Sequence, residues 1–335
     1  MPNAAMRVAV VGLGWWGRII VGLLKSSGKL RPVCGVDTSS AAESFAIQSG
    51  IAFRKEFESV LSDPSVEGVV LCTPHSLHCE QIMRAANAKK HVFCEKPLSL
   101  SRADVLRAVA ACNANGVALA VGHEKRFEPP VQEAFRLAAS GALGTLLQVE
   151  ANFSQDKFLA LAPDNWRMSP KEAPAGPMTA TGIHLLDLSI GLLGPAESVL
   201  ARVQQLGSGL VNGDTLAVLI SFRNKTNALI SAILATPFEG RFAAYGTKGW
   251  VEVRDKAHPE SPEGWTLKTT LRGQRTETKD YPPAKAVLAN LEAFADAAAG
   301  RAPYPVPQQQ MIANISALEA VFKSAKSGRI EQVEN

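Results

Sequence analysis

The sequence lacks the features that mark membrane-spanning, secreted or repetitive proteins. No apolar run approaches the ~20 residues that cross a bilayer, and no repeat or low-complexity tract is present. The apolar run after Arg7 breaks at glycines and at Arg18 without a signal-peptide cleavage site. We therefore expect a soluble, cytoplasmic protein with no membrane partner.

Cysteine is scarce, and its five residues form no C-x-x-C pair. Most of them lie in apolar contexts, and their number is odd. Both observations favour buried free thiols in a reducing compartment, and the sequence predicts no metal site. The five residues are Cys34, Cys72, Cys79, Cys94 and Cys112.

Charge is also modest, since charged residues make up 20% of the 335 and the formal net charge is +4. The basic residues are scattered rather than clustered, so we expect no nucleic-acid partner. A hydrophobic share of 46% is that of an ordinary globular protein. The length favours about two domains.

A glycine motif near the start organises the rest of the chain. Val8–Val11 has the composition of a buried parallel strand, and an apolar helical pattern follows the motif. In a dinucleotide-binding unit the first glycine allows a tight turn, the second lets the backbone approach a pyrophosphate, and the third lets helix and strand pack closely. The cofactor contacts predicted in this motif are Gly12, Gly14, Trp15, Trp16 and Gly17.

Asp37 lies 20 residues beyond Gly17, at the end of a second strand-like run. A carboxylate at that point accepts hydrogen bonds from the adenosine ribose hydroxyls. We expect NAD or NADP as the cofactor: Asp37 favours NAD because a carboxylate repels a 2′-phosphate, while the hydroxyls of Thr38, Ser39 and Ser40 keep NADP open. The alternatives are an ordinary βα turn, or a flavin or S-adenosylmethionine site with similar glycines.

The pattern of elements changes near His123. Before it, short apolar strands alternate with helices, which implies right-handed crossovers and a parallel sheet. After it, longer strands follow one another directly, which implies antiparallel pairing. We predict an α/β protein: an N-terminal Rossmann domain with a doubly wound parallel sheet (residues 1–124), and a C-terminal α/β domain with an open, mainly antiparallel sheet (residues 125–335) for substrate binding and oligomerisation.

Within the second domain we expect strands at 198–206, 214–222, 227–235 and 241–253, and a hairpin across Gly273. The central two of these strands are apolar on both faces. Helices can cover one face only, so the pattern favours a homodimer or homotetramer formed through the sheet.

Two segments follow strands of the first domain, where doubly wound folds bind ligands. Thr73-Pro74 is expected to border the nucleotide, with His78 in the first turn of the next helix, where capping or packing are alternative roles. Glu95-Lys96-Pro97 places a lysine at the same rim, where it can stabilise a developing alkoxide. The Lys-Pro bond is a candidate for the cis form, and a surface turn is the alternative.

His184 and Asp187 lie three residues apart near the start of a helix expected over 181–193, so they share a face. A helix N-terminus disfavours the imidazolium form, which keeps a histidine ready to accept a proton. The alternative is a core histidine on an amphipathic helix. The preceding Ala160–Pro177 is expected to be a long functional loop.

These segments, in this order, resemble the glucose–fructose oxidoreductase, inositol dehydrogenase and rhizopine catabolism (Gfo/Idh/MocA) family over nearly the whole chain. The shared segments are Gly12–Gly17, Thr73-Pro74 with His78, Glu95-Lys96-Pro97, Gly122-His123 with Arg126-Phe127, Trp166-Arg167, Gly182-x-His184-x-x-Asp187, Tyr304-Pro305-Val306 and Ser327-Gly328-Arg329.

The resemblance implies reversible, NAD(P)-dependent oxidation of a hydroxyl on a sugar, sugar derivative or polyol. Lys96 would be the catalytic lysine and His184 the general acid/base. Thr73, Pro74, His78, Glu95 and Arg167 would contact the cofactor. Substrate contacts are predicted for Lys96, Lys125, Arg126, His184 and Asp187.

One position departs from the family pattern. Members often carry an aspartate four residues before the histidine, where this chain has Ala180. Asp187 or a group outside the motif would have to replace that carboxylate. Two further hypotheses therefore stay open: a nucleotide-binding sensor without catalysis, and a lyase, hydrolase or epimerase that recycles bound NAD.

Overall fold

The computed structural model describes residues 5–334, which form two compact units. Unit 1 extends to Glu124 and also contains Val287–Met311. Unit 2 contains Lys125–Ala286 and the residues from Ile312 onward. The predicted second domain, 125–335, therefore needs a correction, because residues 287–311 return to unit 1. That return depends on long-range contacts which no local pattern shows.

A parallel sheet of six described strands forms the centre of unit 1, in the order β3-β2-β1-β4-β5-β6. Its strands bury both faces, as parallel sheets do, and Val8, Ala9 and Val10 have no exposed surface. This is the predicted doubly wound Rossmann sheet, and its strand order reverses between β1 and β4. The strands are β1 (Met6–Val11), β2 (Leu30–Val36), β3 (Ala52–Arg54), β4 (Gly68–Leu71), β5 (His91–Cys94) and β6 (Leu119–Val121).

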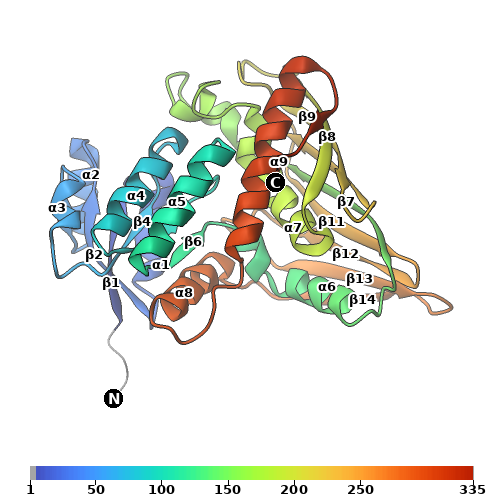
Figure 1. Cartoon of the computed structure of the whole chain (residues 1–335), viewed down its shortest axis with the longest axis horizontal. Helices are drawn as coiled ribbons and strands as arrows, with labels where there is room; N and C mark the ends of the chain where they lie inside the picture. The colour runs from blue at the N-terminus through green and yellow to red at the C-terminus, as the bar shows by residue number, and fades with distance from the viewer. Residues whose placement is uncertain (1–4, 335) are drawn as a thin grey trace. The chain divides into compact units, whose positions relative to one another are not determined.

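Helices pack on both faces of this sheet, and α4 and α5 lie side by side in Figure 1. The helix α8 adds to the same core, where the ring of Phe294 meets Phe93 edge-on at 5.9 Å between centroids. The helices are α1 (Trp15–Leu24), α2 (Ser40–Gln48), α3 (Glu58–Leu61), α4 (His78–Asn87), α5 (Arg102–Asn115) and α8 (Ala286–Ala298).

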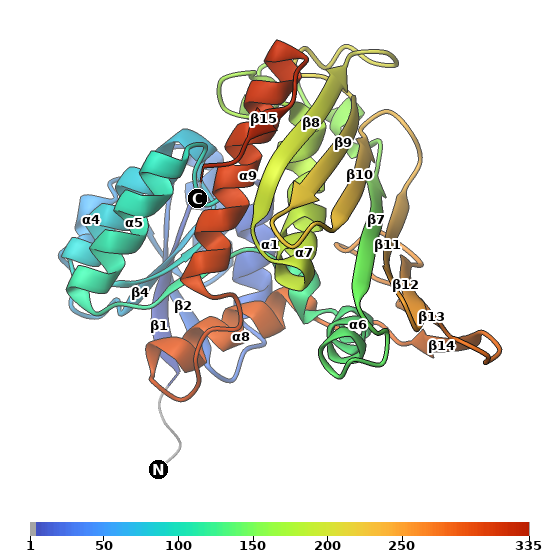
Figure 2. The ribbon, with the colours of Figure 1, turned by 45° about the vertical axis from the view of Figure 1, so that its right-hand side comes forward.

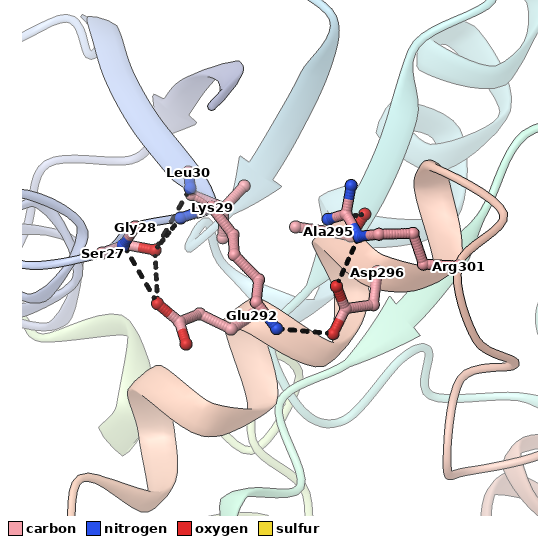
Figure 3. A network of polar contacts seen from close by, with 8 residues as sticks. All are labelled: Ser27, Gly28, Lys29, Leu30, Glu292, Ala295, Asp296 and Arg301. Carbon is pink, nitrogen blue, oxygen red and sulfur yellow. Dashed lines mark hydrogen bonds and ion pairs between the residues drawn. The ribbon is translucent and has the colours of Figure 1, made fainter. Parts of the chain in front are cut away.

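Polar contacts hold α8 to the turn between α1 and β2 (Figure 3). Glu292 accepts hydrogen bonds from the Ser27 hydroxyl at 2.7 Å and from the Gly28 amide. Asp296 pairs with Lys29 at 2.7 Å and with Arg301 at 2.8 Å. These contacts explain why α8 belongs to unit 1 despite its place in the sequence.

The edge strand β6 is closed by side chains from the same returning segment. The Tyr304 hydroxyl donates to the Val121 carbonyl at 2.8 Å and accepts from the Val121 amide at 3.3 Å. Asn290 donates to the same carbonyl at 3.0 Å. An edge strand would otherwise present unpaired main-chain groups.

The described part of unit 2 is built on a mixed sheet in the order β14-β13-β12-β11-β7-β10-β9-β8-β15. β7 and β10 pair in parallel, and every other pair is antiparallel, which confirms the mainly antiparallel prediction. The strands are β7 (Leu146–Ser154), β8 (Ala196–Gln204), β9 (Thr215–Phe222), β10 (Asn227–Ile233), β11 (Glu239–Gly246), β12 (Gly249–Asp255), β13 (Trp265–Leu271), β14 (Glu277–Tyr281) and β15 (Glu331–Gln332).

The single strand predicted at 241–253 is wrong. It is a hairpin, in which β11 and β12 join through Thr247 and Lys248. Thr and Lys are weak turn signals, but the flanking glycines are informative: a Cβ on Gly246 would overlap the Leu143 carbonyl oxygen. The expected hairpin across Gly273 is confirmed as β13 and β14.

Helices cover one face of this sheet. Figure 2 shows α7 (Ile183–Leu193) and the unit 2 part of α9 (Gln308–Ser327) on that side, and α6 (Pro129–Ala139) packs against β12 and β13. The opposite face carries Leu219 and Leu229, which are 40% and 44% exposed. A groove of about 580 Å³ runs across this open face.

Among residues 5–334, no helix has both the length and the apolar character needed to cross a membrane. All five cysteines lie in this range as free thiols, four of them buried. Burial raises the pKa of Cys34 and Cys79 to about 11, so these thiols stay protonated at neutral pH.

The Asp214 carboxylate, at the start of β9, gives unit 2 a stability that depends on pH. Burial alone would raise its pKa, but hydrogen bonds from Leu206, Gly207, Ser208 and Thr215 outweigh burial and lower the pKa to about 2. A lowered folded-state pKa adds stability above the unfolded value of about 4, and that stability is lost as pH falls from about 4 to about 2.

We therefore expect Asp214→Asn to lower the free energy of unfolding by about 2 kcal/mol at neutral pH. The difference from the wild type should shrink as pH falls through that window, as measured by urea unfolding. Asp164→Asn, in an exposed loop, is the matched control. An equal deficit at every pH would contradict the assignment.

Candidate functional site

The glycine turn after β1 is fixed by close main-chain contacts. Gly12 has a φ of +88°, which other residues rarely adopt. A Cβ on Gly17 would overlap the Gly12 carbonyl oxygen, so helix and strand approach as closely as the sequence predicted. A Cβ on Gly14 would meet no atom within 4 Å, so this side of the turn is open.

The start of α1 fits a dinucleotide pyrophosphate. No side chain caps this helix at Gly14, and its first turn carries no acidic residue. Its first amides and its dipole are therefore offered to an anion. Trp15 is 50% exposed beside this end, with its ring 5.8 Å from that of Trp16, which packs against the core.

Asp37 follows β2 and faces the glycine turn. Its Oδ2 accepts the Leu13 amide at 2.8 Å, and its Oδ1 accepts the Ser39 amide at 2.9 Å. A carboxylate offers about four acceptor positions, so two remain for ribose hydroxyls. The predicted ribose ligand is therefore also part of the turn itself.

His78 joins the two turns that follow β4 and β5. The side chain is wholly buried, with Nδ1 2.8 Å from the Pro97 carbonyl oxygen and Nε2 3.0 Å from the Thr73 carbonyl oxygen. Both ring nitrogens therefore face main-chain acceptors. The ring therefore connects the turn at Thr73 to the turn at Pro97.

The main chain at Lys96 is constrained on both sides, by Glu95 before it and by Pro97 after it. The Lys96-Pro97 bond is cis, as the sequence suggested, and the Glu95 carboxylate accepts the Lys96 amide at 3.3 Å. Glu95 is buried and packs against Gly122, where a Cβ would lie 2.7 Å from the carboxyl carbon. The lysine side chain itself is half-buried at the rim of the sheet.

In unit 2, His184 is buried beside Phe153 of β7, with ring centroids 6.1 Å apart. The helical run around it begins earlier than expected, because Met178–Gly182 forms a π-helical turn that continues into α7. His184 therefore lies beyond the first turn. The effect of a helix N-terminus falls off within that turn, so the predicted dipole effect on His184 is corrected to a weak one.

Arg126 and Asp187 form a buried ion pair. The Nε atom of Arg126 lies 2.6 Å from Asp187 Oδ2, and its Nη2 lies 3.0 Å from Oδ1. Gly191, one turn further along α7, leaves room for the guanidinium, which an added Cβ would overlap. Both carboxylate oxygens of Asp187 thus bind Arg126. The sequence analysis named Asp187 as one group that could replace the aspartate that other family members carry at the position of Ala180.

Lys125 also has carboxylate partners. Its ammonium lies 3.0 Å from Asp255 Oδ1 and 3.2 Å from Glu128 Oε1, and 5.0 Å from the centre of the Phe153 ring. Phe153 therefore has both Lys125 and His184 as neighbours within unit 2. Asp255 and Phe153 were missed from the sequence, because no motif links residues so far apart.

Arg167 lies in the predicted functional loop. Its guanidinium carbon is 4.2 Å from the centre of the Trp166 ring. Asn212, which the sequence did not single out, holds the loop by donating to the carbonyls of Arg167 at 2.8 Å and Ala173 at 2.9 Å. Around Arg167 the loop is therefore anchored rather than free.

Comparison with known proteins agrees with this architecture. Residues 6–123 match the oxidoreductase family with an NAD-binding Rossmann fold, and residues 131–252 match the GFO/IDH/MocA C-terminal domain. Together these matches cover most of the chain. The protein belongs to the Gfo/Idh/MocA oxidoreductase family.

Individual relatives are more distant. An uncharacterized oxidoreductase of Bacillus subtilis, YrbE, is 30% identical over 62% of this chain and 61% of its own length. The scyllo-inositol 2-dehydrogenase (NADP+) of the same organism is 24% identical over 98% of this chain and 96% of its own. The structure of a putative NADPH-dependent oxidoreductase from Desulfitobacterium hafniense has a TM-score of 0.90 at 25% identity, covering 99% of both chains.

The Arg126–Asp187 pair gives a prediction for stability. Asp187→Ala leaves a buried guanidinium without its carboxylate, and we expect a loss of about 3–5 kcal/mol in the free energy of unfolding. Glu133→Ala, which removes an exposed pair with Arg136 on α6, should cost less than about 1 kcal/mol.

Urea unfolding measures both variants. The double variant Arg126→Met/Asp187→Leu should recover most of the loss, because neither charge then remains buried. A cost for Asp187→Ala as small as that for the control would contradict a stabilising role for the pair.

Proposed function

We propose that this protein catalyses the reversible oxidation of a hydroxyl group on a sugar, sugar derivative or polyol. The observation that carries the proposal is the open glycine turn before the uncapped α1 helix, with Asp37 beside it. Family membership supports it, as do relatives named as inositol and xylose dehydrogenases. The bound nicotinamide cofactor would accept or return the hydride.

NAD is the proposed preferred cofactor. The Asp37 carboxylate has acceptor positions left for the ribose hydroxyls, and its charge opposes a 2′-phosphate. NADP stays possible because Ser39 and Ser40 are exposed at the same turn. Relatives include an NADP+ enzyme and a structure solved with NAD.

Lys96 and His184 are the proposed reacting pair. The Lys96 ammonium would donate to the substrate oxygen and stabilise its developing negative charge. The His184 imidazole would take the hydroxyl proton during oxidation and return it during reduction.

The remaining predicted contacts follow from this assignment. Thr73, Pro74 and Glu95 are proposed to border the nicotinamide half of the cofactor. Arg167, in the long loop, is also proposed to contact the cofactor. Lys125, Arg126 and Asp187 are proposed to shape the substrate pocket through their ion pairs.

A second candidate is a hydratase or lyase that recycles its bound cofactor. A relative from Escherichia coli named as a 2,7-anhydro-N-acetylneuraminate hydratase is 29% identical over 62% of this chain. Ala180 likewise keeps a non-catalytic nucleotide sensor open. Net release of reduced nicotinamide on addition of a sugar favours the dehydrogenase over both.

The open face of the unit 2 sheet is proposed to mediate a homodimer or homotetramer. Leu219 and Leu229 are exposed there, and arginines and glutamates alternate across β7, β11 and β12. Apolar groups with both signs of charge suit pairing with a second copy. A cytoplasmic location stays the prediction from the sequence.

Replacing either reacting group gives the test. Lys96→Ala and His184→Ala should each lower kcat by about 10²–10⁴-fold, because each removes proton transfer or charge stabilisation. Dissociation constants for NAD should stay within about threefold of the wild-type value, since neither change alters the glycine turn.

Lys89→Ala, at an exposed position in the same unit, is the matched control and should keep full turnover. Turnover is followed by the absorbance of reduced nicotinamide. Near-normal kcat in either variant removes that residue from the mechanism.

A further inference from the structure

Leu13, between the first two glycines of the motif, is held on both sides by charged residues. Its amide donates to Asp37 Oδ2 at 2.8 Å, and its carbonyl accepts from Arg18 Nε at 2.9 Å. Its side chain is buried against Gly35 of β2, where a Cβ would overlap Leu13 Cδ1. The two peptide groups that flank Leu13 are therefore both fixed by neighbours.

Arg18 is itself anchored. Its Nη2 donates to the Ala41 carbonyl at 3.2 Å, and its guanidinium carbon lies 5.1 Å from the centre of the Phe45 ring, one turn further along α2. One guanidinium thus ties the glycine turn to α2. Its planar fork allows both hydrogen bonds at once.

The direction of the next amide follows from peptide geometry. In a planar trans peptide the C=O and N–H bonds point in opposite directions. Because Arg18 holds the Leu13 carbonyl, the Gly14 N–H points away from Arg18. Gly14 is exposed on the open side of the turn, where a dinucleotide-binding loop meets the pyrophosphate.

We propose that Arg18 is a positioning residue of the cofactor site, which aims the Gly14 amide at the pyrophosphate by holding the Leu13 carbonyl. Asp37 holds the preceding peptide in the same way, so it serves both the ribose and the turn. The inference rests on the proposed nucleotide function. It assigns Arg18 to the binding of the pyrophosphate, which NAD and NADP share, and not to the binding of the 2′-phosphate.

Arg18→Met tests this, because methionine keeps an apolar stem over Phe45 and removes the donors. We expect dissociation constants for NAD, NADP and ADP to rise by the same factor, about tenfold, since all three carry the pyrophosphate. kcat at saturating cofactor should stay within about twofold. Arg31→Met, an exposed arginine on β2, is the matched control.

Arg18→Lys keeps a charge without the fork and should give an intermediate loss. It also serves as the test if Arg18→Met does not fold. Hydrogen exchange of the Leu13 amide, which donates to Asp37, should speed up in either variant. Calorimetric titration measures cofactor affinity, and amide exchange measures the stability of the turn. Neither measurement depends on catalytic turnover.

Wild-type affinity for NAD in both variants would overturn the proposal. A loss confined to NADP would also overturn it, because Arg18 would then bind the 2′-phosphate. A wild-type chain that binds NAD but oxidises no hydroxyl removes the proposed function and leaves the role of Arg18 intact.

Discussion

The contact between the Gly12 carbonyl oxygen and Gly17 is the constraint on which the nucleotide site depends. No side chain fits at residue 17, so α1 starts directly against the end of β1. That contact fixes the carbonyl end of the peptide between Gly12 and Leu13, and Asp37 fixes its amide end. The turn is therefore formed by the protein alone, before a ligand supplies any energy. Preorganisation of this kind lowers the cost of binding.

The same principle applies at the rim beside it. His78 connects the turns after β4 and β5, and Gly122 lets the Glu95 carboxylate lie close to β6. Tyr304 and Asn290 close the outer edge of β6. The position of Lys96 thus depends on groups from three strands and a returning segment. In unit 2, two buried ion pairs join the segment after β6 to other elements: Lys125 pairs with Asp255 of β12, and Arg126 pairs with Asp187 of α7.

The sequence predicts most of the fold and part of the site. The glycine motif, Asp37 and the alternation of strands and helices predict the Rossmann unit, because these signals are local. The β11–β12 hairpin was missed because Thr247 and Lys248 are weak turn formers. The return of α8 to unit 1 has no local signal, since it rests on contacts such as Ser27 with Glu292.

Within the site, residue types were predicted better than their partners. The ion pair between Lys125 and Asp255 joins positions 130 residues apart. The π-helical turn before His184 makes the helical run start earlier than predicted. The spacing of apolar residues that predicts an α-helix does not reveal such a turn. Asn212 holds the long loop by donating to main-chain carbonyls. The sequence does not distinguish Asn212 from other polar residues that could have the same role.

A crystal structure of the chain with NAD and a bound sugar or polyol tests the account most directly. We expect the pyrophosphate on the Gly14 amide and one substrate hydroxyl within hydrogen-bond reach of both the Lys96 ammonium and the His184 imidazole. A pyrophosphate bound elsewhere, or a substrate that touches neither side chain, would contradict it.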